Sequence, residues 1–238
     1  MIKDTWSNDI SGTGGLTLKA SNKGILELSG QNTYTGDTVV NGGELKNNGL
    51  ISGNVIINAG GTFSGIGTEK GNVTNNGGIL KPGNSIGTET INGNLLISGN
   101  SEYDVEYDTD GHSDLIHVDG KAALGGSVLL IGLGGQPAYL AQRKFTIVSA
   151  GKGVTGQFSG VSSLANYSFL NPYLSYDANN AYFGFNLTPF SVVGRTINQR
   201  NVGNALTIGA FGPIAGPGAN ILNTLFYGSY QSAQSVMD

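Results

Sequence analysis

The stretch SGQNTYTGDTVVNGGEL, residues 29–45, combines two kinds of residue that suggest different structures. Gly, Asn and Thr dominate it, as in a turn-rich segment, yet Tyr34, Val39, Val40 and Leu45 stand where a β-strand could bury them. Asn and Gly favour tight turns, whereas Val and Tyr favour strands with a packed face. The stretch therefore predicts short strands separated by sharp corners.

The same pattern extends in both directions along the chain. Apolar residues alternate with other residues in short runs, which is typical of strands with one buried face. These runs contain Leu16 and Leu18, Leu26 and Leu28, Val55 and Ile57, Leu95 and Ile97, and Tyr103, Val105 and Tyr107. Turns with positive φ are expected at four dipeptides, Asn41-Gly42, Asn48-Gly49, Asn76-Gly77 and Asn92-Gly93. Helical periodicity is missing from roughly the first 190 residues, so this region is predicted to be all-β.

Imperfect repeats indicate how the strands are arranged. VVNGGELKNNG (39–49) and VTNNGGILKPG (73–83) share apolar residues, an Asn-Gly-Gly turn and a Leu, and ISGN occurs at 51–54 and 97–100. Repeats on this scale predict coils of chain that stack and bury their inner faces against one another. We therefore expect an all-β right-handed parallel β-helix, a solenoid. A β-sandwich is the alternative, although the Cys-Trp-Cys pattern and Greek-key crossover signals of that fold are missing.

Composition limits the possible functions. The 238 residues include 40 Gly and 6 Pro, but 38% are hydrophobic, which is enough for a packed core. Cysteine is absent, which excludes disulfides, thiolate metal sites and cysteine nucleophiles. The net charge of −4 argues against a nucleic-acid partner. The polar start at Met1 shows no signal peptide, so we expect either a cytosolic chain or a fragment whose export signal lies elsewhere.

Three stretches carry a family resemblance. GTGGLTLKASNKGILELSGQNTYTGDTVVNGGEL (12–45) resembles the autotransporter-associated β-strand repeat. Residues 80–124, which begin LKPGNSIG, and residues 145–185, from FTIVSAGKGVTGQFSGVSS to LNPYLSYDANNAYFGF, resemble the C-terminal passenger region of bacterial type V autotransporters. This resemblance implies an intramolecular folding element, often called an autochaperone. We expect it to form an aromatic-rich cap that contains Phe145, Phe158, Tyr173, Tyr176, Tyr182, Phe183 and Phe185.

The C-terminal fifth has a different pattern. Residues 201–237 carry no charge, and apolar residues recur at helical spacing in two segments, about 194–210 and 219–237, around GPIAGPG (212–218). Pro213, Pro217 and polar Asn220 and Asn223 argue against a membrane-spanning helix. INQRNVGNAL (197–206) is similar to the linker that joins a passenger to its outer-membrane barrel, and the barrel itself is expected to be missing from the chain.

These patterns divide the chain into three predicted regions. Residues 1–84 form β-helix coils that include the repeat, residues 85–190 form the C-terminal β-helix and its autochaperone-like cap, and residues 191–238 form a short linker with helical segments.

Several motifs suggest enzyme or metal chemistry. Gly83-Asn84-Ser85-Ile86-Gly87 matches G-x-S-x-G, but a nucleophile elbow needs a helix after the turn, and a corner is the favoured interpretation. Paired acids would suit a polysaccharide-active β-helix enzyme, which stays an alternative, although no second acidic cluster faces the one described next.

The densest ionisable group lies between residues 102 and 119. It consists of Glu102, Asp104, Glu106, Asp108, Asp110, Asp114 and Asp119, together with His112 and His117. Alternation over 102–108 predicts a solvated acidic face on one strand. A calcium loop at Asp108-x-Asp110-Gly111 and a zinc site at the two His are the weaker interpretations, because the Gly stands too early for an EF-hand and the His lack a third ligand.

Together these observations predict a non-enzymatic stem of an autotransporter passenger that promotes folding and surface display of the upstream passenger. No catalytic, cofactor-binding or metal-binding residue and no cofactor is predicted. The expected partners are the chain's own upstream passenger and outer-membrane barrel, with possible host-cell or self-association contacts. The expected location is the cell surface, attached to the bacterial outer membrane. An adhesin or self-association module is the main alternative function.

Overall fold

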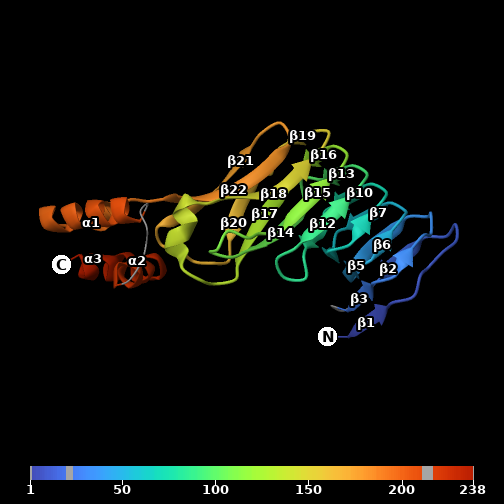
Figure 1. Cartoon of the computed structure of the whole chain (residues 1–238), viewed down its shortest axis with the longest axis horizontal. Coiled ribbons are helices and arrows are strands. Elements are labelled where there is room, and N and C mark those ends of the chain that lie inside the picture. The colour runs from blue at the N-terminus through green and yellow to red at the C-terminus, as the bar shows by residue number, and fades with distance from the viewer. Residues whose placement is uncertain (1, 20–23, 211–216, 238) are drawn as a thin grey trace.

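Three β-sheets enclose one elongated interior in the computed structural model, which describes residues 2–19, 24–210 and 217–237. Figure 1 shows the strands stacked along the long axis, with the N-terminus at one end and the helices at the other. Neighbouring strands pair in parallel from β1 to β20. The expected parallel β-helix is therefore confirmed.

The first sheet contains β2 (Leu16–Lys19), the first part of β5 (Thr38–Asn47), β7 (Val55–Asn58), β10 (Val73–Asn76), β13 (Leu95–Ile97), β16 (Ala122–Leu124) and β19 (Val154–Gly156). The second contains β1 (Lys3–Trp6), β3 (Ile25–Leu28), the rest of β5, β8 (Gly61–Gly65), β11 (Ile79–Pro82), β14 (Glu102–Tyr107), β17 (Ser127–Gly132) and β20 (Gly160–Ser163). The third contains β4 (Gln31–Asn32), β6 (Leu50–Ile51), β9 (Thr68–Glu69), β12 (Thr88–Ile91), β15 (Leu115–Val118), β18 (Lys144–Ala150), β22 (Asn180–Leu187) and β21 (Leu170–Tyr176).

Side chains from successive coils form continuous columns in the interior. In the second sheet the strand register aligns six buried residues, Leu26, Leu45, Phe63, Leu80, Tyr103 and Val128. Alternate residues of a strand point to opposite faces, so every second residue enters such a column. Each coil therefore buries its apolar face only against the coils above and below it.

An asparagine ladder joins the coils at the corner before the first sheet. Asn54 Nδ2 donates to Asp37 Oδ1 (3.0 Å), and the backbone N–H groups of Asn72 and Asn94 donate to the amide oxygen of the preceding Asn (3.0 and 2.9 Å). The backbone N–H of Lys121 then donates to Asn94 Oδ1 (2.9 Å). The spacing along this ladder grows from 17 to 18, 22 and 27 residues, so the coils lengthen toward the C-terminus.

The structure confirms one predicted repeat and corrects the other. Leu45 and Leu80 of the longer repeat occupy the same column, with Phe63 between them. The two ISGN stretches are not equivalent, because Ile51 lies in the third sheet and Ile97 in the first. A four-residue match is too short to fix the position of a residue within a coil.

The predicted positive-φ turns are correct at only one of the four Asn-Gly dipeptides. Gly77 has φ of 95°, whereas Asn41-Gly42 lies inside β5. Close packing, not backbone conformation, explains Gly49 and Gly93. A Cβ added to Gly49 would stand 2.1 Å from the carbonyl oxygen of Gly30, and one added to Gly93 would stand 2.3 Å from that of Gly71. Glycine is needed there because the coil beneath comes so close.

The C-terminal helices differ partly from the prediction. They are α1 (Ile197–Gly209), α2 (Pro217–Tyr227) and α3 (Tyr230–Val236), so the second predicted segment consists of two helices. Thr196 and Gln199 form a capping box at the start of α1, and the Ser229 side chain caps α3. Most of the predicted break at 212–218 lies outside the described residues. Among the described residues, no helix has the length and hydrophobicity that a membrane crossing requires.

Candidate functional site

The stack of parallel coils ends at an antiparallel β-hairpin, which we call the cap hairpin (β21 and β22). Strand β18 pairs in parallel with β15 on one side and antiparallel with β22 on the other. A register shift between Thr146 and Val148 accompanies the change of direction, and β22 then pairs antiparallel with β21. The hairpin thus replaces the next parallel coil of the third sheet.

Aromatic rings fill the interior beneath the cap hairpin. Phe145 and Phe183 stack with ring centroids 4.5 Å apart and an interplanar angle of 4°. The ring of Tyr107 lies 5.3 Å from Phe183 and 5.6 Å from Phe185, and all four residues are buried. Such ring pairs contribute beyond their buried area. The interior column is therefore closed by a group of aromatic rings in mutual contact, whereas the coil column mixes aliphatic and single aromatic side chains.

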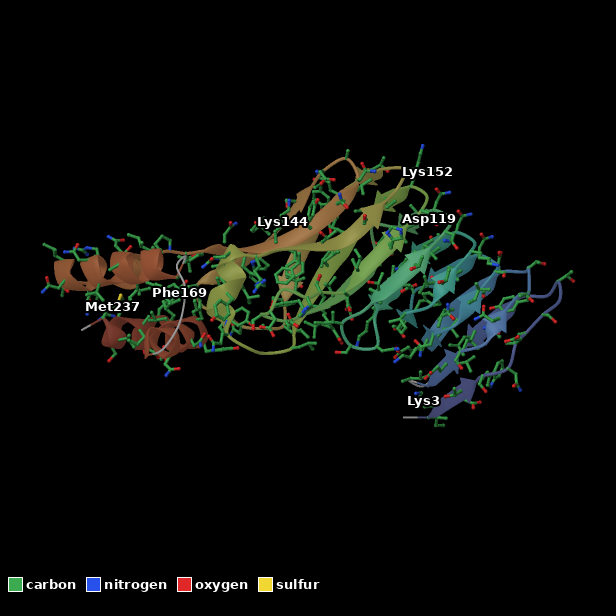
Figure 2. All side chains as sticks on the ribbon, viewed as in Figure 1. Lys3, Asp119, Lys144, Lys152, Phe169 and Met237 are labelled. Carbon is green, nitrogen blue, oxygen red and sulfur yellow. The ribbon has the colours of Figure 1, made fainter. Side chains whose placement is uncertain are left out.

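A second aromatic cluster connects the cap to the helices. The Phe169 ring lies 4.9 Å from Phe190 and 5.0 Å from Tyr230, and Phe190 lies 5.4 Å from Phe226. Phe190 begins the short 3-10 helix η2 (Phe190–Val193). Figure 2 shows Phe169 where the β-helix meets the helical part.

Helix α1 packs closely on η2. A Cβ added to Gly203 would stand 2.6 Å from the backbone nitrogen of Ser191. Thr207 Oγ1 also accepts a hydrogen bond from the Phe190 N–H (2.9 Å). A second 3-10 helix, η1 (Pro137–Gln142), supports the same region, because Gln142 Nε2 donates to the carbonyl oxygen of Ala210 (2.8 Å). The first helical segment therefore packs against η1 and η2 beside the cap.

The outer surface of the cap hairpin is organised around Asp177 in its turn. Tyr182 Oη donates to Asp177 Oδ2 (2.5 Å), and the N–H groups of Asn179 and Asn180 donate to Oδ1 (both 2.8 Å). These hydrogen bonds, that from Tyr182 first, lower the pKa of Asp177 to about 2. The Lys144 ammonium lies 3.6 Å from the centre of the Tyr182 ring.

The predicted cap residues separate into two sets. Phe145, Phe158, Phe183 and Phe185 are buried as expected. Tyr173, Tyr176 and Tyr182 are only partly buried. Tyr173 and Tyr182 face outward, because each alternates with inward-facing residues of its strand. Tyr176 instead lies opposite the buried Ala181 and packs against the core, where its Oη accepts a hydrogen bond from the Phe158 N–H (3.1 Å). Sequence analysis did not assign Tyr107, Tyr167, Phe169, Phe190 and Phe226 to the cap. The alternation around Tyr107 marked it as inward-facing, but Tyr167 and Phe169 lie outside any regular strand pattern.

At the opposite end of the β-helix, the described residues leave part of the apolar interior exposed. A groove of about 290 Å³ is lined there by residues of β1, β2 and β3 and by Ile2 and Gly24. Its apolar side chains include Trp6, which is 43% exposed, and Ile2, which is 82% exposed. In the middle of the stack the equivalent inner faces are covered by the next coil.

The acidic group between residues 102 and 119 is only partly a solvated face. Glu102, Asp104 and Glu106 alternate with buried residues on β14, as predicted. Asp114, in contrast, is fully buried, and its carboxylate accepts the N–H groups of Gly87 (2.9 Å) and Glu106 (2.7 Å). The alternation over 102–108 made no prediction for Asp114, which follows an irregular loop where alternation cannot indicate burial.

In the loop with the calcium-like pattern, the Asp108 carboxylate accepts hydrogen bonds from the backbone of the same loop. Asp108 Oδ1 accepts the N–H groups of Asp110, Gly111 and His112 (all 2.9 Å), and His112 Nδ1 lies 2.7 Å from Asp108 Oδ2. Partial burial raises the pKa of Asp108, but the hydrogen bonds from His112 and Gly111 outweigh it and leave the pKa below its ordinary value. Within the described part of the chain, no three His, Cys, Asp or Glu side chains are grouped to hold a metal ion.

The G-x-S-x-G motif forms a turn between two strands. Gly83 has φ of 92° and Gly87 donates its N–H to the buried Asp114, after which the chain enters strand β12. Gly87 and Ile86 line a groove of about 410 Å³ together with His112 and Lys144. The strand–turn–strand context matches the predicted corner.

Comparison with known proteins identifies related sequences. Residues 21–46 match the passenger-associated-transport-repeat family, and this match includes β3, β4 and most of β5. Two proteins from Serratia marcescens, each named extracellular serine protease, are 36% identical over 222 residues and 31% identical over 223 residues. Both matches cover 89% of this chain, which spans about a fifth (21%) of the length of these relatives. Together with the parallel β-helix, the repeat and these relatives show that the chain belongs to the autotransporters, as a region of the passenger.

Proposed function

We propose that this passenger region is a non-enzymatic stem, which promotes the folding and surface display of upstream passenger coils during type V secretion. Its working part is the autochaperone-like region 85–190, which ends in the cap. The proposal assigns two partners, the upstream passenger and the outer-membrane barrel of the same protein. It places the stem outside the cell, attached to the outer membrane.

The main support for this proposal is the difference between the two ends of the β-helix. The C-terminal end is closed by the cap hairpin and the aromatic cluster of Tyr107, Phe145, Phe183 and Phe185. At the N-terminal end, the described residues present an apolar groove and one edge of β1 that pairs with no described strand. A closed end stops growth of the stack, whereas an open end accepts another coil. The stack is therefore suited to growth in one direction only, toward the N-terminus.

The cap also suits early folding. Strands β21 and β22 form a local hairpin, and local contacts form faster than distant ones because they close shorter loops. Strand β18 then joins the antiparallel hairpin to the parallel sheet. A chain that emerges C-terminus first would complete this region before its upstream coils. Each later coil would add to an existing edge, which avoids the unfavourable ordering of an isolated coil.

A variant pair on β22 tests the proposal in the full-length protein. Phe185 is buried in the cap, whereas Tyr182 on the same strand faces outward. We expect Phe185→Ala to reduce strongly the amount of protease-resistant passenger on the cell surface, while Tyr182→Ala leaves most of it. Normal display and folding of the passenger in Phe185→Ala would contradict the proposal.

The order of folding provides a second test. During refolding of the purified chain, brief proteolysis at increasing times should show protection of β18, β21 and β22 before protection of β5 to β8. Limited proteolysis at rising denaturant should likewise leave a core within about residues 85–190 until last. Earlier protection of the N-terminal coils would mean that the cap does not nucleate the stack.

A further inference from the structure

Three acidic side chains lie in the interior near the corner between the second and third sheets. They come from successive coils, with Glu69 on β9, Glu89 on β12 and Asp114 just before β15. Their residues are 0%, 1% and 0% exposed. Charged groups are rarely buried so completely unless they are paired.

Asp114 is satisfied, but the two glutamates are not. Asp114 accepts a backbone N–H at each oxygen. Glu69 Oε1 accepts one hydrogen bond from Asn47 Nδ2 (2.6 Å). Glu69 Oε2 and both oxygens of Glu89 have no donor among the described protein groups.

The strand register brings the two glutamates together. Glu69 lies opposite Ile91 in the parallel pairing of β9 and β12. Glu89 stands two residues before Ile91 and shares its inward face, so the carboxyl groups of Glu69 and Glu89 meet across adjacent coils. Two ionised carboxylates in contact, without a cation, repel each other strongly in a buried site. A proton on one of them removes this repulsion and supplies the missing donor.

We propose that the Glu69–Glu89 pair is a proton-linked joint, which takes up a proton when the coils of β9 and β12 stack and which loosens when that proton is lost. The bond that forms is an O–H bond on one carboxylate, and the proton comes from solvent. The stacking of these coils thereby responds to pH, a property that does not depend on the proposed role in secretion.

The groups that face the pair reinforce this behaviour. Asp114 and the buried Tyr103 of β14 face Glu89, and Asn47 of β5 faces Glu69. Besides Glu89, the charges that act on Asp114 include those of Glu106 and of Lys81, whose ammonium lies 3.6 Å from the Glu106 carboxylate. The immediate surroundings of the pair are therefore neutral or acidic.

The direction of the pH effect follows from the acidity of the pair. Burial raises the pKa of Glu69 to about 7, and burial together with the charge of Glu69 raises the pKa of Glu89 well above its ordinary value. A raised pKa in the folded state means that the folded state binds more protons. The stabilising contribution is fully present below the ordinary pKa of 4.5 and is lost as the pH rises through about 7.

Denaturant unfolding of the purified chain between about pH 5 and pH 9 tests the joint. For each proton released on unfolding, the folding equilibrium constant should fall by about tenfold per pH unit. Asp104 and Asp114, whose pKa values are also raised to about 7, add to the slope of the wild type. The decisive measurement therefore compares the slope of stability against pH in the wild type with that in Glu89→Gln. The slope of Glu89→Gln should correspond to about one proton fewer. Asp110→Asn, which removes a charge from an exposed turn, should keep the wild-type slope.

Infrared spectroscopy of the wild type gives a readout that does not depend on the folding of a variant. The wild type at neutral pH should show the carbonyl band of a protonated carboxylic acid, and Glu69→Gln should weaken it. An unchanged slope in Glu89→Gln, or no protonated carboxylic acid in the wild type, would overturn the proposal. Loss of the pH dependence on addition of K⁺ or Ca²⁺ would also overturn it, since it would indicate a cation site in place of a shared proton.

Discussion

The coils between β5 and β16 and the cap that follows them share one interior but are stabilised differently. In the coils, each inward side chain lies between its equivalents above and below, as Leu80 lies between Phe63 and Tyr103. In the cap, Phe183 contacts Tyr107, Phe145 and Phe185, which come from three different strands. A repeating column therefore allows the stack to grow, whereas a cluster built from several strands ends it.

The largest effect is expected for Phe183→Ala. Removing this fully buried ring from its aromatic neighbours should lower the free energy of unfolding by about 3–5 kcal/mol. Because the cap is a cluster, the loss should appear as destabilisation of the cap hairpin and helix α1 together. Equilibrium unfolding followed by aromatic circular dichroism measures it. A loss confined to β22 would mean that the cap is not one cooperative unit.

Leu80→Ala should cost slightly less and act more locally. The cavity lies in a single column, so about 3 kcal/mol of stability should be lost, chiefly by β8, β11 and the coils on their N-terminal side. Hydrogen exchange resolved by peptide should show faster exchange there and unchanged protection in β18 and β22. An equal increase of the hydrogen-exchange rate in the cap would contradict the difference between the two regions.

Gly49→Ala tests how close the coils lie. The new methyl group would meet the carbonyl oxygen of Gly30 and force two coils apart, at a cost of about 1–3 kcal/mol. Gly99→Ala is the matched control, because a Cβ at Gly99 meets no atom within 4 Å. Thermal unfolding should separate the two variants clearly. Similar melting temperatures would show that the corner can relax.

The smallest effect is expected for Asp177→Asn at the surface of the cap. The lowered pKa of Asp177 means that its contribution is present above the ordinary value of 3.8 and is lost as the pH falls through about 2. Wild type and variant should therefore differ in stability at neutral pH and converge in strong acid. Unfolding measured across the acidic range checks this, and a constant difference at every pH would contradict it.

Much of the fold could be predicted because its signals are local. Alternation identified Val55, Ile57, Tyr103 and Tyr107 as inward-facing, and all four are buried. The two-residue strands of the third sheet, such as β9 with Thr68 and Glu69, are too short to show alternation. For that reason the buried Glu69 escaped sequence analysis. Glu89 also escaped it, because Ile91 is the single apolar residue of β12 and the strand shows no apolar alternation.

The sequence by itself determined the stacked coils, the corners between them and the autotransporter relationship, because strand alternation, turn residues and repeat motifs are all encoded over short distances. Only the tertiary structure decided which glycines are required by close packing, where the parallel stack turns antiparallel, and which acids face each other inside. These features depend on register between residues many positions apart, as between Gly49 and Gly30 or Glu69 and Glu89. Register is set when whole coils pack against each other, so it cannot be predicted from the sequence of a single coil.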